Sequence, residues 1–164
     1  MRIGLAVILG FMLLLFYKET IANAVVGPVK NQLKPEVSLV LAEFGLFNPL
    51  DSGEQVFVPS RTVPHNENQR YSWIVFLDTK KTTVRWREEF TLPAAPAIWD
   101  SAETQGSQFI SEDKRVSILH KEVEPQQGLI SHSWTVAPGD PKGRYIIRVI
   151  IENRLEEVFE FDVY

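Results

Sequence analysis

Most of the chain consists of short runs in which apolar and polar residues alternate. In residues 82–92 (TTVRWREEFTL), Val84, Trp86 and Phe90 fall on one face and charged residues fill the other, while Glu88 breaks the apolar face. A period of two is typical of a β-strand with one buried face. Runs rich in Val, Ile, Phe, Trp and Thr predict strands at residues 37–47, 56–58, 61–64, 71–77, 82–92, 116–123, 129–136, 144–151 and 157–163.

The spacing of these runs predicts an all-β fold. Proline, glycine and asparagine separate the runs, and no long stretch after residue 35 has the apolar spacing of a helix. About seven or eight full strands over about 130 residues is the density typical of two packed sheets. We therefore expect one immunoglobulin-like (fibronectin III-like) β-sandwich over residues 36–164.

The N-terminal residues have a different character. Arg2 precedes an uncharged apolar run at residues 3–17, and residues 22–24 (ANA) offer a small-x-small cleavage site, the order typical of a secretory signal peptide. The run is short for a membrane span of about 20 residues, but an uncleaved membrane anchor is the alternative. We expect residues 1–24 to be a signal peptide or anchor and residues 25–35 a linker. The remainder would then be periplasmic, extracellular, or anchored to the cytoplasmic membrane and facing outward.

Charge and composition narrow the range of partners. The formal net charge of −4 disfavours nucleic acid, which requires a basic surface. The absence of cysteine removes disulfides, thiolate metal ligands and cysteine nucleophiles. The sequence contains no G-x-S-x-G elbow and no glycine pattern for phosphate or dinucleotide binding. We expect no nucleic-acid partner, no cofactor, and membrane contact only through the N-terminal segment.

Two histidines and a glutamate are the candidates for a metal site. A five-residue loop separates the runs that contain them, and a hairpin would place His120 opposite His132 with Glu122 on the same face. Zinc takes three or four N, S or O ligands, so the three side chains could converge. A fourth ligand is not evident, and a one-residue slip would scatter the group. The preferred interpretation is therefore two partly exposed histidines and no metal.

The aromatic residues mainly predict a core. Gly143 and Tyr145 follow a turn and begin a strand, an arrangement similar to the tyrosine corner of immunoglobulin-like sandwiches, so we expect them to be structural. Trp86 and Trp134 occupy strand-periodic positions and are also expected to be structural, in the core. Trp99, in a loop, is the candidate for an exposed aromatic with a binding role.

The last two runs predict a hairpin with a definite register. If residues 153–155 form a three-residue connection, Ile147 faces Phe161, and Arg148 lies opposite Glu160 as a cross-strand ion pair. A two-residue turn would instead place Ile147 opposite Glu160 and bury a carboxylate, which is costly.

Several short motifs together are similar to those of a known family. They are the opening strand VLAEFGLF (40–47), the element TVP (62–64), the aromatic strand at 71–77, the turn GRY (143–145) and the closing FDV (161–163). In this order they resemble an uncharacterised bacterial family, domain of unknown function 3859, over about residues 36–164. That family has no established activity, so the resemblance implies a fold and no catalytic residues.

These observations favour a protein that is not an enzyme. An export signal, no assembled catalytic set, and sheet edges that could accept a partner strand predict an exported envelope domain that binds another protein. One alternative is a carbohydrate- or cell-wall-binding module that uses Trp99. The other is a metal-dependent enzyme that uses His120 and His132.

Overall fold

The protein folds into strands only, within the residues that the structure describes. A computed structural model describes residues 35–49, 53–99 and 107–164, so the predicted signal or anchor and most of the predicted linker lie outside the described residues. In the described part, no helix is long and apolar enough to span a membrane. The strands are β1 (Val37–Pro49), β2 (Gln55–Pro59), β3 (Thr62–Val63), β4 (Arg70–Thr79), β5 (Val84–Thr91), β6 (Ser107–Ile110), β7 (Val116–Val123), β8 (Leu129–Thr135), β9 (Gly143–Ile151) and β10 (Leu155–Val163).

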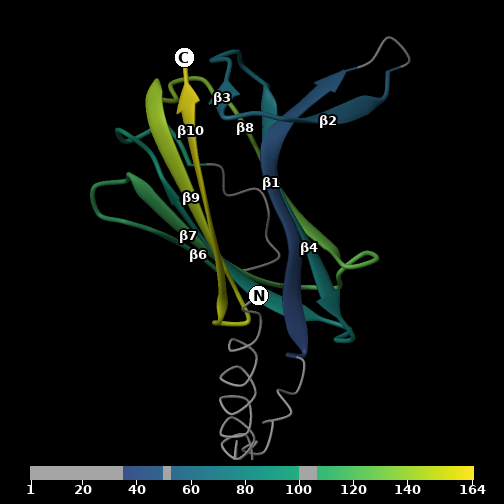
Figure 1. The fold of residues 1–164 in the computed structure, drawn as a ribbon. Coiled ribbons are helices and arrows are strands. Elements are labelled where there is room, and N and C mark those ends of the chain that lie inside the picture. The colour runs from purple at the N-terminus through teal and green to yellow at the C-terminus, as the bar shows by residue number, and fades with distance from the viewer. Residues whose placement is uncertain (1–34, 50–52, 100–106) are drawn as a thin grey trace, which may run out of the picture. The chain divides into compact units, whose positions relative to one another are not determined.

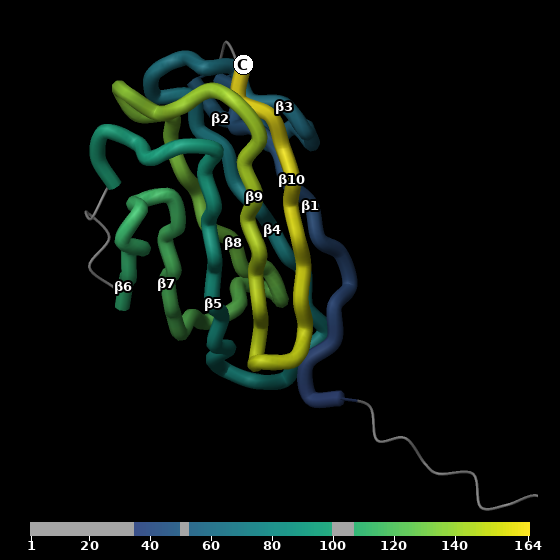
Figure 2. The backbone as a smooth tube through the Cα atoms, turned by 90° about the vertical axis from the view of Figure 1, so that its left-hand side faces the viewer, coloured from purple at the N-terminus to yellow at the C-terminus, as the bar shows by residue number. Residues whose placement is uncertain are grey.

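The strands form two sheets that face each other, which confirms the predicted sandwich. One sheet has four strands in the order β2-β1-β4-β8, and the other has six in the order β3-β10-β9-β5-β7-β6. Figure 1 shows β1 and β4 to the right of β9 and β10, and Figure 2 shows β5, β7, β9 and β10 side by side in front of β4 and β8. The short strand β6 was not predicted, because its four residues carry a single apolar pair, Phe109 and Ile110.

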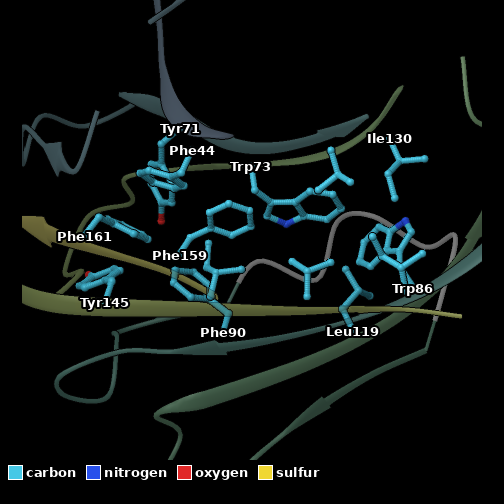
Figure 3. Packing of buried hydrophobic residues seen from close by; sticks show 14 of the residues in the cluster. Phe44, Tyr71, Trp73, Trp86, Phe90, Leu119, Ile130, Tyr145, Phe159 and Phe161 are labelled. Carbon is cyan, nitrogen blue, oxygen red and sulfur yellow. The ribbon is translucent and has the colours of Figure 1, made fainter. Parts of the chain in front are cut away.

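Aromatic side chains fill the space between the sheets. Phe44 of β1 stacks on Phe161 of β10, with ring centroids 4.2 Å apart, and Phe90 of β5 lies 5.7 Å from Tyr145 of β9. Figure 3 shows these rings pointing toward one another from the two sheets, with Trp73 further along. Trp73 is fully buried. Side chains of this size bury much apolar area, so their burial is a main stabilising contribution.

The predicted hairpin of residues 116–123 and 129–136 is wrong. β7 pairs with β5 in the six-stranded sheet, whereas β8 pairs with β4 in the four-stranded sheet. The loop between them crosses from one sheet to the other and is anchored by Gly128, whose carbonyl accepts a hydrogen bond from Leu77 N at 2.8 Å. Gly128 has a φ of +87°, and a Cβ at this position would lie 2.5 Å from Leu77 O. Only glycine allows the loop to approach β4 so closely.

The hairpin of β9 and β10 forms with a register two residues away from the predicted one. Ile147 faces Phe159, and Ile151 faces Leu155, so the connection is Glu152-Asn153-Arg154. Glu152 and Asn153 adopt positive φ, which the prediction did not anticipate. A shift of two keeps every side chain on its predicted face but changes the ion pair.

Ion pairs and turn contacts follow the observed register. Arg148 Nη2 lies 2.7 Å from Glu156 rather than near Glu160, which instead lies 3.1 Å from Arg144. The carboxylate of Glu152 is held by Lys81 and by the backbone N–H of Arg85. The hydrogen bond from Lys81 is the main cause that lowers the pKa of Glu152. These contacts tie the turn to the neighbouring strand β5.

The start of β9 has the hydrogen bond of a tyrosine corner. Tyr145 is 1% exposed, and its hydroxyl donates to the carbonyl of Pro141 at 2.6 Å. Gly143, two residues earlier, has a φ of +132° and packs on Pro93. Burial is the main cause that raises the pKa of Tyr145. The ring thus fills the end of the core while its hydroxyl fixes the preceding turn.

Because Gly128 lies so close to β4, replacing it by alanine should destabilise the protein more than the same replacement at Gly53. Gly128→Ala should lower the free energy of unfolding by about 2–4 kcal/mol, because strained backbone and a steric clash act together. Gly53→Ala is the matched control, since Gly53 has a φ of +84° and open space around its Cβ position. It should cost only about 1 kcal/mol. Urea denaturation of both variants measures the difference, and equal costs would contradict the role assigned to Gly128.

Removing the hydroxyl of Tyr145 should lower the stability of the protein without changing the packing of the ring. Tyr145→Phe keeps the ring but leaves the Pro141 carbonyl without its donor, and should lower the free energy of unfolding by about 1–1.5 kcal/mol. Tyr164→Phe is the control, because Tyr164 is exposed. Thermal unfolding followed by circular dichroism measures both; a Tyr145→Phe variant as stable as the control would argue against the corner.

Candidate functional site

The three predicted metal-ligand candidates do not share one face. His120 and Glu122 lie on β7, whereas His132 lies on β8 in the other sheet. His120 is exposed, and Glu122 accepts a hydrogen bond from the hydroxyl of Thr83 at 2.8 Å. His132 points into the sandwich and is 9% exposed. Within residues 35–49, 53–99 and 107–164, no three His, Cys, Asp or Glu side chains are grouped as a metal site requires. The convergence that the hairpin would have allowed does not occur, because that hairpin does not form, and His132 is buried rather than partly exposed.

The tryptophans predicted for the core lie in or against it. Trp86 is 3% exposed and meets Trp73 edge to face at 5.2 Å, and Trp134 packs on Phe90 at 5.0 Å. Trp99 is half-buried against Phe90 and Trp134, and its Nε1 donates to the carbonyl of Lys114 at 2.7 Å. Other residues of the protein therefore already cover part of the Trp99 ring. A role for Trp99 in carbohydrate binding stays a prediction.

A buried glutamate lies at the centre of the sandwich. Glu88 on β5 is 1% exposed and accepts hydrogen bonds from side chains of the opposite sheet. Two nitrogens lie close to Oε2 of Glu88: Trp73 Nε1 at 2.5 Å and His132 Nδ1 at 3.1 Å. A third, Trp134 Nε1, lies 3.0 Å from Oε1 of Glu88. Trp73 and His132 are register partners on β4 and β8. The pairing of β4 with β8 therefore places the Trp73 and His132 side chains next to each other at Glu88.

Each carboxylate oxygen of Glu88 lies within hydrogen-bond distance of an indole N–H. Both of its oxygens accept, and an ionised carboxylate is an acceptor only. Negative charge at Glu88 also contributes, after burial and the charges of Tyr145 and Asp140, to raising the pKa of Tyr71. In sequence, Glu88 was only an interruption of an apolar face; its donors lie on strands that no local pattern connects to β5.

A groove runs along one side of the sandwich, between β1 of one sheet and β10 of the other. Its volume is about 630 Å³, and we call it the β1–β10 groove. Phe44 and Phe159 are buried at its floor, with ring centroids 6.3 Å apart. Figures 1 and 2 both show β1 and β10 alongside each other, and the two strands belong to different sheets. The residues that line it are Ala42, Glu43, Phe44, Pro59, Ser60, Arg61 and Glu157–Glu160.

Both strands that border the groove have an unpaired edge. β1 pairs with β2 only from Gly45 onward, and β10 pairs with β3 only at Asp162 and Val163. Along β1, the carbonyl of Phe44 accepts from Ser60 N, and that of Val37 accepts from the Arg154 guanidinium. Between these two points the outer edge of β1 faces no strand in the described structure.

Apolar residues are exposed along this edge of β1. The pairing with β4 shifts by one residue between Leu39 and Leu41, so that Val40 forms a bulge. Val40 is 66% exposed, Leu41 44% and Leu39 37%. Contiguous exposed apolar residues next to a groove are typical of an interaction surface.

The rim of the groove is acidic. Glu43, Glu157 and Glu160 lie in its lining with a single cation, Arg61. In the described structure Glu160 is paired with Arg144, whereas Glu43 and Glu157 have no ion pair. The groove therefore offers free backbone groups, apolar contact and negative charge in one place.

Comparison with known proteins identifies the fold and a family. A family model described as "PM0630 beta sandwich domain" matches residues 42–164, well over half of the chain. An immunoglobulin-like protein from Pseudomonas aeruginosa is 18% identical, with a TM-score of 0.53, over 79% of this chain and 98% of that one. The soluble domain of PmoD from a Methylocystis species is 15% identical, with a TM-score of 0.41, over 77% and 96%. No curated protein matches the sequence significantly. The predicted immunoglobulin-like sandwich is confirmed, whereas the name domain of unknown function 3859 is not.

The buried carboxylate predicts a large effect from replacing one of its oxygens by an NH2 group. Glu88→Gln should lower the free energy of unfolding by about 2–4 kcal/mol, because the new amide donor must face an indole or imidazole N–H. Glu89→Gln is the matched control. Glu89 points to the other face, is half-buried, and pairs with Arg87 and Arg148, so its neutralisation should cost below about 1 kcal/mol. Urea denaturation at pH 7 compares the two; similar costs would show that the Glu88 network contributes little.

Proposed function

We propose that this chain, which belongs to the PM0630 beta sandwich domain family, is a non-enzymatic protein-interaction domain of the cell envelope. It accepts an extended segment of a partner protein, which adds as a strand to the free edge of β1. The observation that carries the proposal is the unpaired edge of β1 beside the β1–β10 groove, with Leu39, Val40 and Leu41 exposed along it. Placement in the envelope is supported by the signal-like residues 1–24.

Strand addition fits this edge for a physical reason. An unpaired edge presents a row of N–H and C=O groups that an extended peptide can satisfy, while side-chain contacts supply the specificity. Val40 and its neighbours provide apolar contact for alternate side chains of the added strand. The bulge at Val40 interrupts the regular pairing, which disfavours indiscriminate edge-to-edge association.

The negative charge of the groove favours a partner segment that carries positive charge. Glu43 and Glu157 lack ion pairs in the described structure and lie in the groove with one arginine. A segment that alternates apolar residues with lysine or arginine would complement both the exposed aliphatic side chains and these carboxylates. A second copy of this chain is disfavoured, because pairing of two β1 strands would bring two Glu43 carboxylates toward the same interface.

Binding of designed peptides to the full-length protein tests the proposal. A fluorescein-labelled peptide of alternating valine and lysine should bind at least about tenfold more tightly than one of valine and glutamate, as measured by anisotropy. Hydrogen exchange should show new protection of the backbone amides between Ser38 and Glu43 when the lysine peptide binds. Protection confined to another strand, or equal affinity for both peptides, would overturn the proposal.

Two substitutions with equal change in charge sharpen this test. Val40→Lys places a cation on the β1 edge and should weaken binding of the lysine peptide about tenfold. Phe109→Lys is the matched control, because Phe109 is 61% exposed on β6, at the far end of the other sheet. Both variants should unfold within about 0.5 kcal/mol of the parent, since both sites are on the surface. If only Phe109→Lys weakened binding, the peptide would bind near β6 rather than on β1, and the proposal would be wrong.

A further inference from the structure

One carboxylate of the β1–β10 groove occupies an inward-facing position. Glu157 on β10 lies opposite Val149 of β9, and Val149 is fully buried in the core. Register partners in a pleated sheet point to the same face, so Glu157 also points toward the inside of the sandwich. Its neighbours on that face of β10 are Leu155 and Phe159, which pack against or within the core. Glu157 thus interrupts an apolar row, as Glu88 does on β5.

Unlike Glu88, the carboxylate of Glu157 has no partner among the residues that the structure describes. Its side chain is half-buried, yet no hydrogen bond or ion pair there involves it. The other acidic residues of β10 are paired with arginines, as Glu156 is with Arg148. A carboxylate that is partly withdrawn from water without a donor is unfavourable, and a cation brought by a ligand would compensate it.

Across the groove, β1 leaves space beside this carboxylate. Ala42 lies opposite Val75 of β4, which is fully buried, so the methyl group of Ala42 points inward. The next inward-facing residue, Phe44, has its ring centroid 6.3 Å from that of Phe159. Figure 3 shows these two rings pointing toward each other from opposite sheets. Ala42 and Glu157 line the same groove, so the space over the rings is bordered by a methyl group and by a carboxylate.

A strand added to the free edge of β1 would place alternate side chains in this space. Side chains of a strand alternate between the two faces of its sheet. Those on the inner face would follow Ala42 and Phe44 into the groove. Those on the outer face would lie beside Leu41, which is 44% exposed. The inner set therefore meets aromatic rings and a carboxylate, whereas the outer set meets an aliphatic surface.

We propose that the β1–β10 groove is a specificity pocket for a basic side chain of the added segment. This proposal rests on the proposed function, because the added strand positions that side chain. The cationic head group pairs with Glu157, and the aliphatic stem covers the rings of Phe44 and Phe159. The apolar residues of the segment then lie on the outer face, next to Leu41. An apolar side chain in the groove would fill the space but leave the carboxylate unpaired.

Two peptides that differ only in charge test the pocket. One alternates valine with arginine, and the other alternates valine with citrulline, which has nearly the shape of arginine but no charge. Both carry fluorescein, and anisotropy measures their binding to the full-length protein. The arginine peptide should bind at least about tenfold more tightly. Equal affinity would overturn the pocket while leaving strand addition intact, and no binding of either peptide would overturn both.

Two carboxylates of the same groove provide matched variants. Glu157→Gln removes the inward-facing charge and should weaken binding of the arginine peptide at least about tenfold, with little effect on the citrulline peptide. Glu43→Gln removes the same charge from a residue that faces outward, opposite Ile74. It should weaken binding by less than about threefold, because an exposed pair contributes little. Equal losses in the two variants would show general attraction to an acidic surface and would overturn the pocket.

Filling the space beside β1 gives an independent test. Ala42→Leu should weaken binding of the arginine peptide about tenfold, because the larger side chain takes the place of the arginine stem. Ala95→Leu is the matched control, since Ala95 is exposed in the loop after β5. In the parent complex, nuclear Overhauser effects should connect the arginine side chains to the methyl group of Ala42. Contacts with Leu41 instead would place the arginines on the outer face and overturn the proposal.

Discussion

The fold depends on how the charge of Glu88 is accommodated between the sheets. A carboxylate taken out of water is tolerated only where donors surround it. Trp73, His132 and Trp134 supply those donors from β4 and β8, so the two sheets are joined by polar contacts as well as by aromatic packing. A one-residue slip of β8 would turn Ser131 and Ser133 inward and leave the carboxylate without two of its donors. The network therefore specifies the register of β8 as strictly as any apolar contact does.

Because side chains fill the interior, the larger cavities in the described structure lie at the two sides where the sheets end. On one side, β1 and β10 expose free edges over an acidic groove. On the other, a second and smaller cavity is bordered by β6, β7 and β8. The two sides differ in shape and in sign of charge, so one ligand would not suit both.

The sequence predicts the sandwich well, because alternation identifies strands wherever one face is buried. Val84, Trp86 and Phe90 are all buried on β5 as expected. Pairing between strands was harder to predict. The hairpin that would have joined His120 to His132 failed because Gly128 fits against Leu77 of β4, a contact between distant residues. The β9–β10 register was displaced by two residues because Glu152 and Asn153 adopt positive φ. A glutamate at an inward position between two buried aromatics, as at Glu88, was the one local signal of a polar network.

The same carboxylate links the stability of the core to the shape of the smaller cavity beside β8. His132 and Trp134 bond to Glu88 and also line this cavity, so the contacts that join the two sheets also order part of its wall. The edge of β1 has no such support, since Val40 bulges and its neighbours are exposed. Rigid walls suit a small ligand, which gains too few contacts to offset the ordering of several side chains. An exposed edge suits a peptide, whose many backbone hydrogen bonds can offset that ordering.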